Sequence, residues 1–188
     1  NNLERSGSLF IVKNIFSLII SVLFIFFGLA YPLKPAQISL ISVFTIGLPA
    51  FFLSQMPNRD LIKGRFITNI LLKALPAALT DVLVVCAMVY FGNIFNVAPT
   101  DIATASTILM SIVGMMIVFQ ICKPMDMYKM WMWILCGVGL ACCMIFISKM
   151  FDITSMSNRC ILLCVNFSII AEPCLRYMTL ITKKIQSF

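Results

Sequence analysis

Long apolar stretches alternate with short polar connectors along the whole chain. Five of the six stretches contain enough residues for a helix to cross the ~30 Å hydrocarbon core of a bilayer. The second is shorter and is interrupted by Gly47 and Pro49. The predicted spans are Leu9–Ala30, Ile38–Leu53, Ile70–Phe91, Ala103–Ile121, Trp131–Ile147 and Ile161–Ile181. This pattern predicts an all-α integral membrane protein, a six-helix bundle that forms a single transmembrane domain.

Composition supports the same class. Of the 188 residues, 61% are hydrophobic and only 11% are charged, whereas soluble domains have roughly 45–50% apolar and 25% charged residues. An ordinary soluble enzyme and a disordered chain are therefore both excluded. The net charge of +7 does not indicate nucleic-acid binding, because the basic residues lie in short runs between the spans rather than in one patch.

The distribution of Lys and Arg predicts the orientation. With both termini in the cytoplasm, nine basic residues fall in inner segments and three in outer loops. The inner residues are Arg5, Arg59, Lys63, Arg65, Lys123, Lys129, Arg176, Lys183 and Lys184, and the outer residues are Lys34, Lys149 and Arg159. Lys13 and Lys73 lie near inner ends of spans, where we expect them to snorkel to the surface. We expect a multi-pass protein of the plasma membrane.

No motif for catalysis or for a resident cofactor is visible. The chain contains no P-loop, no G-x-S-x-G and no H-E-x-x-H, and it has no His. The eight cysteines lie mostly inside apolar stretches without a C-x-x-C pair, which favours packing between helices over a zinc site or disulfides. The candidate chemistry therefore lies in the polar residues inside the spans.

The first two spans carry polar side chains at helical spacing. They are Asn14, Ser17 and Ser21 in the first span, and Ser39, Ser42 and Thr45 in the second. Pro49 has no N–H, so the carbonyl of Thr45 loses its helical partner. A free carbonyl beside a hydroxyl can bind a hard cation. The same residue types also favour close helix packing, so a cation path and simple packing both remain open interpretations.

Two acidic residues lie at bilayer depth, where a charge needs a partner or a function. Asp81 follows Pro76 in the third span, and Glu172 precedes Pro173 in the sixth. Each is a candidate cation ligand, and a pair with a neighbouring Lys or hydroxyl is the alternative. Glu172 is the stronger candidate, because an acid next to a helix break meets freed carbonyls.

The short turn at residues 31–36 makes the first two spans antiparallel neighbours. Asn14 and Thr45 then lie at similar depth at ~1.5 Å per residue. We therefore expect Asn14, Ser17, Ser42 and Thr45 to converge near the midplane as candidate ligands of a transported cation. Glu172 is the best supplier of a carboxylate, with Asp81 second.

Two segments resemble a known family. Residues Ile46–Asn58, which read I-G-L-P-A-F-F-L-S-Q-M-P-N, resemble the sixth membrane helix of P-type cation-transporting ATPases. The opening Asn1–Arg5 resembles the stalk by which the fifth helix leaves the phosphorylation domain. From Asn1 to Pro49 the register matches the calcium-pump pattern without a gap, and the remaining spans fit the last four pump helices in number and topology.

The resemblance implies a fragment of a longer chain, corresponding to helices five to ten of a ten-helix pump. Four helices and the actuator, phosphorylation and nucleotide domains would lie upstream, and the intact pump would use ATP and Mg²⁺. The four trailing helices and the absence of C-P-C favour the calcium, sodium–potassium and magnesium branches over heavy-metal pumps. The T-I-G-L-P form resembles a bacterial subgroup, with Ca²⁺ or Mg²⁺ as the transported cation.

The pump pattern transfers to this chain only in part. By the resemblance, Asn14 and Thr45 fall on residues that bind calcium. Ser17 and Ile46 fall where calcium pumps carry a glutamate and an aspartate, and Ser42 where they carry an asparagine. The loss of both carboxylates implies a weaker calcium site, because ligand charge tunes affinity.

A second class of function remains open at this stage. The chain could be a self-standing six-helix membrane protein, such as a secondary transporter or an assembly factor. The first residue is Asn1 rather than an initiator Met, which favours a piece of a longer chain.

Overall fold

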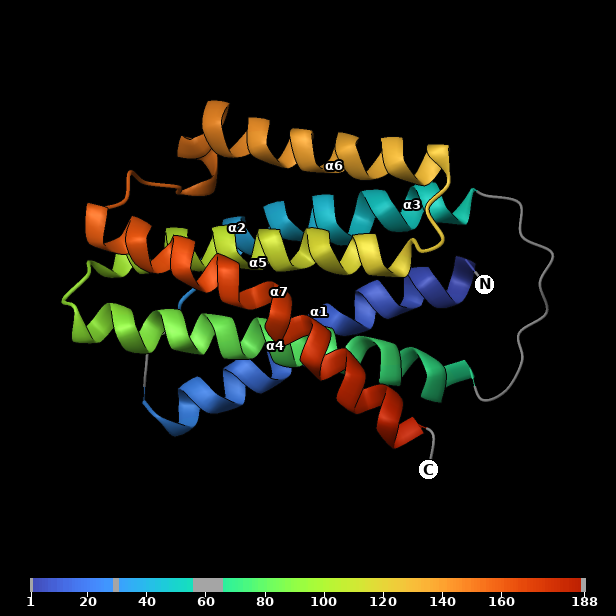
Figure 1. Cartoon of the computed structure of the whole chain (residues 1–188). Helices are drawn as coiled ribbons and strands as arrows, with labels where there is room; N and C mark the ends of the chain where they lie inside the picture. Colours follow the sequence, from blue (N-terminus) through green and yellow to red (C-terminus); the bar gives the residue numbers. More distant parts are fainter. Residues whose placement is uncertain (1, 29–30, 56–65, 187–188) are drawn as a thin grey trace.

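Six helices of membrane-spanning length run side by side in the computed structural model, which describes residues 2–28, 31–55 and 66–186 (Figure 1). The elements are α1 (Asn2–Phe26), α2 (Pro35–Ser42), the π-helical turn η1 (Val43–Gly47), α3 (Leu48–Ser54), α4 (Phe66–Ile94), α5 (Pro99–Ile121), α6 (Met127–Phe146), the 3₁₀ turn η2 (Ser148–Phe151) and α7 (Asn158–Gln186). No strand occurs within the described ranges. The predicted all-α six-helix membrane bundle is confirmed.

Local sequence signals set several helix ends. α1 ends at Phe26, four residues before the predicted end of its span, because Gly28 adopts a left-handed φ of 62°. Pro35 and Pro99 start α2 and α5, at positions where a helix needs no N–H donor. The predicted inner loop with Arg59, Lys63 and Arg65 lies outside the described residues.

The helix α4 lies at the centre of the bundle. It packs against α1 on one side and against α5 and α7 on others, and α7 crosses both α4 and α5 (Figure 1). Ala74, Ala77 and Ala78 are buried on α4, and small residues let helix backbones approach closely where lipid supplies no hydrophobic driving force. α6 lies at the edge, against α3, η1 and α5.

The second span is one continuous helical rod built from α2, η1 and α3. In η1 the N–H of Leu48 donates to the carbonyl of Val43, five residues back, so the turn is wider than an α-helical turn. Pro49 lies at the start of α3 and has no N–H to donate to the carbonyl of Thr45. The expected interruption at Gly47 and Pro49 is therefore a widened turn rather than a break in the helix.

Candidate functional site

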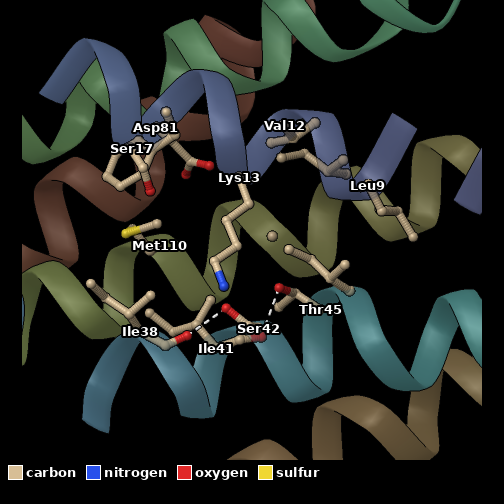
Figure 2. A pocket seen from close by; sticks show the side chains of 14 residues that line it. Leu9, Val12, Lys13, Ser17, Ile38, Ile41, Ser42, Thr45, Asp81 and Met110 are labelled. Atoms are coloured by element: carbon tan, nitrogen blue, oxygen red, sulfur yellow. Dashed lines mark hydrogen bonds between the residues drawn. The ribbon is translucent and has the colours of Figure 1, made fainter. Parts of the chain in front are cut away.

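A small pocket lies inside the bundle, between α1, the second span, α4 and α5. Its volume is about 40 Å³, which is room for a single ion or for very few water molecules. Most of its wall is apolar. The polar side chains that line it are Lys13, Ser17, Ser42, Thr45 and Asp81 (Figure 2).

The pocket lies near mid-membrane depth. Ser17 lies about halfway along the span Ser6–Phe26, and Thr45 about halfway along Pro35–Ser54. Asp81 is similarly central in Ile70–Ile94. Polar groups at this depth are costly unless they are paired or functional. The pocket therefore concentrates its polar groups where the bilayer tolerates them least.

The hydroxyls of Ser42 and Thr45 have a defined orientation. Ser42 Oγ donates to the carbonyl of Ile38 at 2.6 Å, and Thr45 Oγ1 donates to the carbonyl of Ile41 at 2.8 Å (Figure 2). A hydroxyl has one hydrogen and two lone pairs. Because each hydrogen is used within the helix, what remains for the pocket is acceptor capacity. Two oxygen acceptors, one turn apart on the same rod, suit a cation or an N–H donor.

Asp81 brings a carboxylate to the same pocket from α4. Only 4% of its surface is exposed, and no hydrogen bond reaches its Oδ1 from the described residues. Its neighbour Thr80 is also buried but donates to the carbonyl of Pro76 at 2.8 Å. Asp81 therefore holds unused acceptor capacity in a buried position, where such a group is expensive to leave unpaired.

A glycine on α5 permits the second span to approach this closely. A Cβ added to Gly114 would lie 2.8 Å from Cγ2 of Thr45 and 3.0 Å from its Cβ. Gly114 also lines the pocket. The absence of a side chain at this position thus lets η1 place Thr45 against α5.

The structure brings together three of the four predicted converging residues and one of the two predicted acids. Ser17, Ser42, Thr45 and Asp81 share the pocket. Asn14 is exposed on α1 and does not line it. The reason is helical geometry, because Asn14 is rotated by about 100° from Lys13 and the pocket takes the face of Lys13 and Ser17.

Glu172 lies elsewhere. Its carboxylate is exposed and pairs with Arg176 one turn along α7, at 2.8 Å. It lines a larger cleft of about 790 Å³ that also includes Arg176, Lys123 and Trp133. The structure therefore gives Asp81, and not Glu172, a place among the pocket hydroxyls.

Lys13 was expected to snorkel to the inner surface, and the structure shows a different arrangement. Its half-buried side chain extends from α1 across the pocket toward the second span, with Nζ near Ser42 (Figure 2). The sequence signal for this arrangement was the spacing between Lys13 and Ser17, because residues at i and i+4 share a helix face.

The cysteines do not add metal ligands to this pocket. The described part of the chain holds no cluster of His, Cys, Asp and Glu able to bind a metal.

Comparison with known proteins finds relatives among bacterial cation-transporting ATPases. The chain is 26% identical over 169 residues to a probable cation-transporting ATPase of Streptococcus pneumoniae, which covers 85% of this chain and 22% of that protein. It is 28% identical over 166 residues to the calcium-transporting ATPase CtpE of Mycolicibacterium smegmatis, covering 81% of this chain and 20% of that protein. The chain is similar to bacterial cation-transporting ATPases.

These matches support the P-type ATPase family inferred from the sequence and leave its branch open. A third relative, CtpE of Mycobacterium tuberculosis, is 30% identical over 91 residues, covering 42% of this chain and 11% of that protein. The chain thus spans about a fifth or less of the relatives that it matches. No family model matches it, and no solved structure matches it. The similarity and the six membrane-length helices confirm a multi-pass membrane protein and support the plasma-membrane location.

Proposed function

We propose that this chain is the C-terminal membrane domain of a P-type cation ATPase and that its pocket forms part of the cation path. One observation carries the proposal. Near mid-membrane depth, two hydroxyls have donated their hydrogens to backbone carbonyls, and the same small pocket holds a buried carboxylate whose Oδ1 has no hydrogen-bond partner among the described residues. Oxygen acceptors without competing donors are the ligands that hard cations take.

The transported ion is proposed to be a divalent cation, Ca²⁺ or Mg²⁺. Two of the relatives described above are named calcium-transporting ATPases, which favours Ca²⁺. Calcium takes about 6–8 oxygen ligands, more than the pocket's three hydroxyls and one carboxylate provide. Backbone carbonyls, water and helices outside this chain would complete the site. The exposed Asn14 lies on a face of α1 that is open to such helices.

Coupling to ATP would pass through α1. In the resembled pumps the first residues of this helix, which correspond to Asn1–Arg5 here, belong to the stalk, and phosphoryl transfer from ATP with Mg²⁺ takes place in upstream domains. Lys13 and Ser17 are residues of α1. An axial displacement of the stalk would therefore move them relative to Ser42 and Thr45.

A self-standing six-helix transporter or assembly factor is the alternative. The genomic sequence upstream of the Asn1 codon distinguishes the two. An in-frame D-K-T-G, the motif whose aspartate accepts phosphate in these pumps, supports the pump. A start codon directly before Asn1 supports the alternative.

Cation dependence tests the pocket itself. In the full-length protein, Thr45→Val keeps the shape and removes the acceptor, and we expect the Ca²⁺ concentration for half-maximal phosphorylation by ATP to rise about tenfold, as for one lost ligand. Asn14→Ala should act in the same direction. Thr107→Val is the matched control, because Thr107 is also buried and donates to the carbonyl four residues back, but it lies on α5 outside the pocket.

The result that contradicts the proposal is equally definite. If Thr45→Val and Thr107→Val both keep the cation dependence of the unmodified protein, the pocket hydroxyls serve only helix packing.

A further inference from the structure

The larger cleft and the small pocket meet at one side chain inside the bundle. The cleft reaches the predicted inner end of four spans, where its lining includes Ser8, Leu72, Lys123 and Thr182. At its deep end on α5 it reaches Ile117, and this residue also lines the pocket that holds Thr45 and Asp81. Among the described residues, Ile117 is the one side chain that the two cavities share.

About one helical turn separates the two cavities. On α1, Ser8 lines the cleft and Val12 lines the pocket, and on α4, Ala77 lines the cleft and Asp81 the pocket. Residues four positions apart are about 6 Å apart along a helix axis. Ser8 and Ala77 have small side chains, whereas Ile117 has a bulky apolar side chain that is only 4% exposed. Ile117 is therefore placed to fill the layer between the cavities.

Water is the occupant that the cleft lining suits. Glu172 lies about 15 Å from the inner end of its span at 1.5 Å per residue, where its carboxylate pairs with Arg176 at 2.8 Å. Both side chains stay more than half exposed, and charged side chains at this depth face a bundle interior or a water-filled cavity. The cleft, of about 790 Å³, has room for about 25 water molecules at ~30 Å³ each.

The charges of the cleft argue against a second cation site. Its described lining contains Lys123 and Arg176 but a single carboxylate, that of Glu172. Lys123 also lies over the ring of Phe119, with Nζ 5.2 Å from the ring centroid. The excess of positive charge does not concentrate cations in the cleft.

We propose that the cleft is a water-filled vestibule on the inner side of the membrane and that Ile117 is the hydrophobic seal between this water and the cation pocket. An apolar constriction excludes water and ions, because an ion would lose its hydration there without gaining ligands. This inference rests on the proposed function for its role in transport. In the pump, the seal prevents a cation bound near Thr45 and Asp81 from leaking back through the cleft.

Thiol labelling tests the water in the cleft without any transport. The full-length protein without native cysteines carries Glu172→Cys, and a charged, impermeant methanethiosulfonate is added to the inner side of inside-out vesicles. The control retains Cys174 as its single cysteine, because Cys174 lies on the same helix at similar depth but does not line the cleft. We expect Glu172→Cys to react about tenfold faster than Cys174. A rate no higher than that of Cys174 means that lipid chains or other helices fill the cleft, and it overturns the vestibule.

The seal is tested with Ag⁺, a probe small enough for the pocket of about 40 Å³. Ag⁺ replaces the proton of a thiol and forms a silver thiolate. In the same cysteine-free background and without divalent cations, Thr45→Cys should react slowly with Ag⁺ from the inner side, and about tenfold faster when Ile117→Ala is added. Ile117→Leu keeps the apolar volume and should leave the reaction slow.

Ile102→Ala is the matched control for the loss of a buried side chain. Ile102 is a buried isoleucine of α5 that lines neither cavity, so its substitution should leave the reaction of Thr45→Cys slow. A fast reaction with Ile117 in place, or equal rates in Ile117→Ala and Ile102→Ala, overturns the seal.

Cation accumulation tests the role of the seal in transport. In inside-out vesicles supplied with ATP, Ile117→Ala should lower the steady-state accumulation of Ca²⁺ by about half relative to Ile102→Ala, while ATP hydrolysis continues. Unchanged accumulation in Ile117→Ala overturns this role. If no cation stimulates phosphorylation of the unmodified protein, the proposed function fails, and the labelling rates still decide the vestibule and the seal.

Discussion

The contact between Thr45 and Gly114 shows how little space separates the second span from α5. The atom nearest to a Cβ at Gly114 is 2.8 Å away and belongs to a buried Thr whose hydroxyl is bonded to its own helix. We therefore expect Gly114→Ala to push η1 away from α5, to lower the free energy of unfolding by about 1–3 kcal/mol through overpacking, and to raise the Ca²⁺ requirement. Thermal unfolding and Ca²⁺-dependent phosphorylation of the full-length protein measure both effects.

Gly137→Ala on α6 provides the comparison for this substitution. Its added Cβ would meet only the terminal Cε of Met115, at 3.3 Å, and a flexible Met side chain can move aside. We expect near-normal stability. If Gly114→Ala is as mild as Gly137→Ala, the spacing between η1 and α5 is not tightly constrained.

At the scale of elements, the start of α2 is tied to the loop between α6 and α7. The Gln37 side chain is fully buried, and it accepts from the N–H of Lys34 at 3.0 Å and donates to the carbonyl of Asp152 at 3.2 Å. Lys34 also pairs with the carboxylate of Asp152 at 2.9 Å, but both side chains are substantially exposed. These contacts join two of the loops that the sequence predicts to lie on the outer side.

The buried hydrogen bonds of Gln37 should contribute more to stability than the exposed ion pair between Lys34 and Asp152. Gln37→Leu leaves two backbone groups without their partner and should cost about 1–3 kcal/mol of stability. Asp152→Asn removes only the exposed ion pair, tolerates the left-handed φ of 56° at this position, and should cost less than about 1 kcal/mol. Thermal unfolding of the two variants at low and high salt measures the difference. A larger loss of stability for Asp152→Asn than for Gln37→Leu would contradict this ranking of the two contacts.

At the scale of the whole molecule, the predicted orientation is still to be measured. The described chain begins and ends at the same end of the bundle (Figure 1), and the excess of basic residues predicts that this end faces the cytoplasm. In a background without native cysteines, Arg65→Cys should resist an impermeant thiol reagent added to intact cells, whereas Lys149→Cys should react. Labelling of Arg65→Cys from outside would reverse the orientation.

Catalysis provides a second test at this scale. The 188 residues contain no phosphorylatable D-K-T-G aspartate and no nucleotide-binding loop. We expect the purified chain to show no ATP hydrolysis, and the full-length protein to show hydrolysis that vanadate inhibits. Vanadate-sensitive hydrolysis by the 188-residue chain alone would contradict its assignment as a membrane domain without catalytic residues.

The helix count and the membrane class follow from the order of apolar and polar residues, because a chain in lipid must satisfy its backbone hydrogen bonds within each helix. The meeting of Ser17, Ser42 and Thr45 was predictable for a related reason. Spacings of three residues place Ser42 and Thr45 on one face, and a short turn makes the two spans neighbours.

The rotation of each helix about its axis could not be predicted in this way. On α1 the packing against α4 turns Lys13 into the pocket and leaves Asn14 exposed, although the two residues are adjacent in sequence. Likewise, Asp81 reaches the pocket because α4 is central, whereas Glu172 faces a separate cleft on α7. Successive side chains of a helix point in directions about 100° apart. The contacts among several helices, and not the spacing within one helix, therefore select the residues that meet.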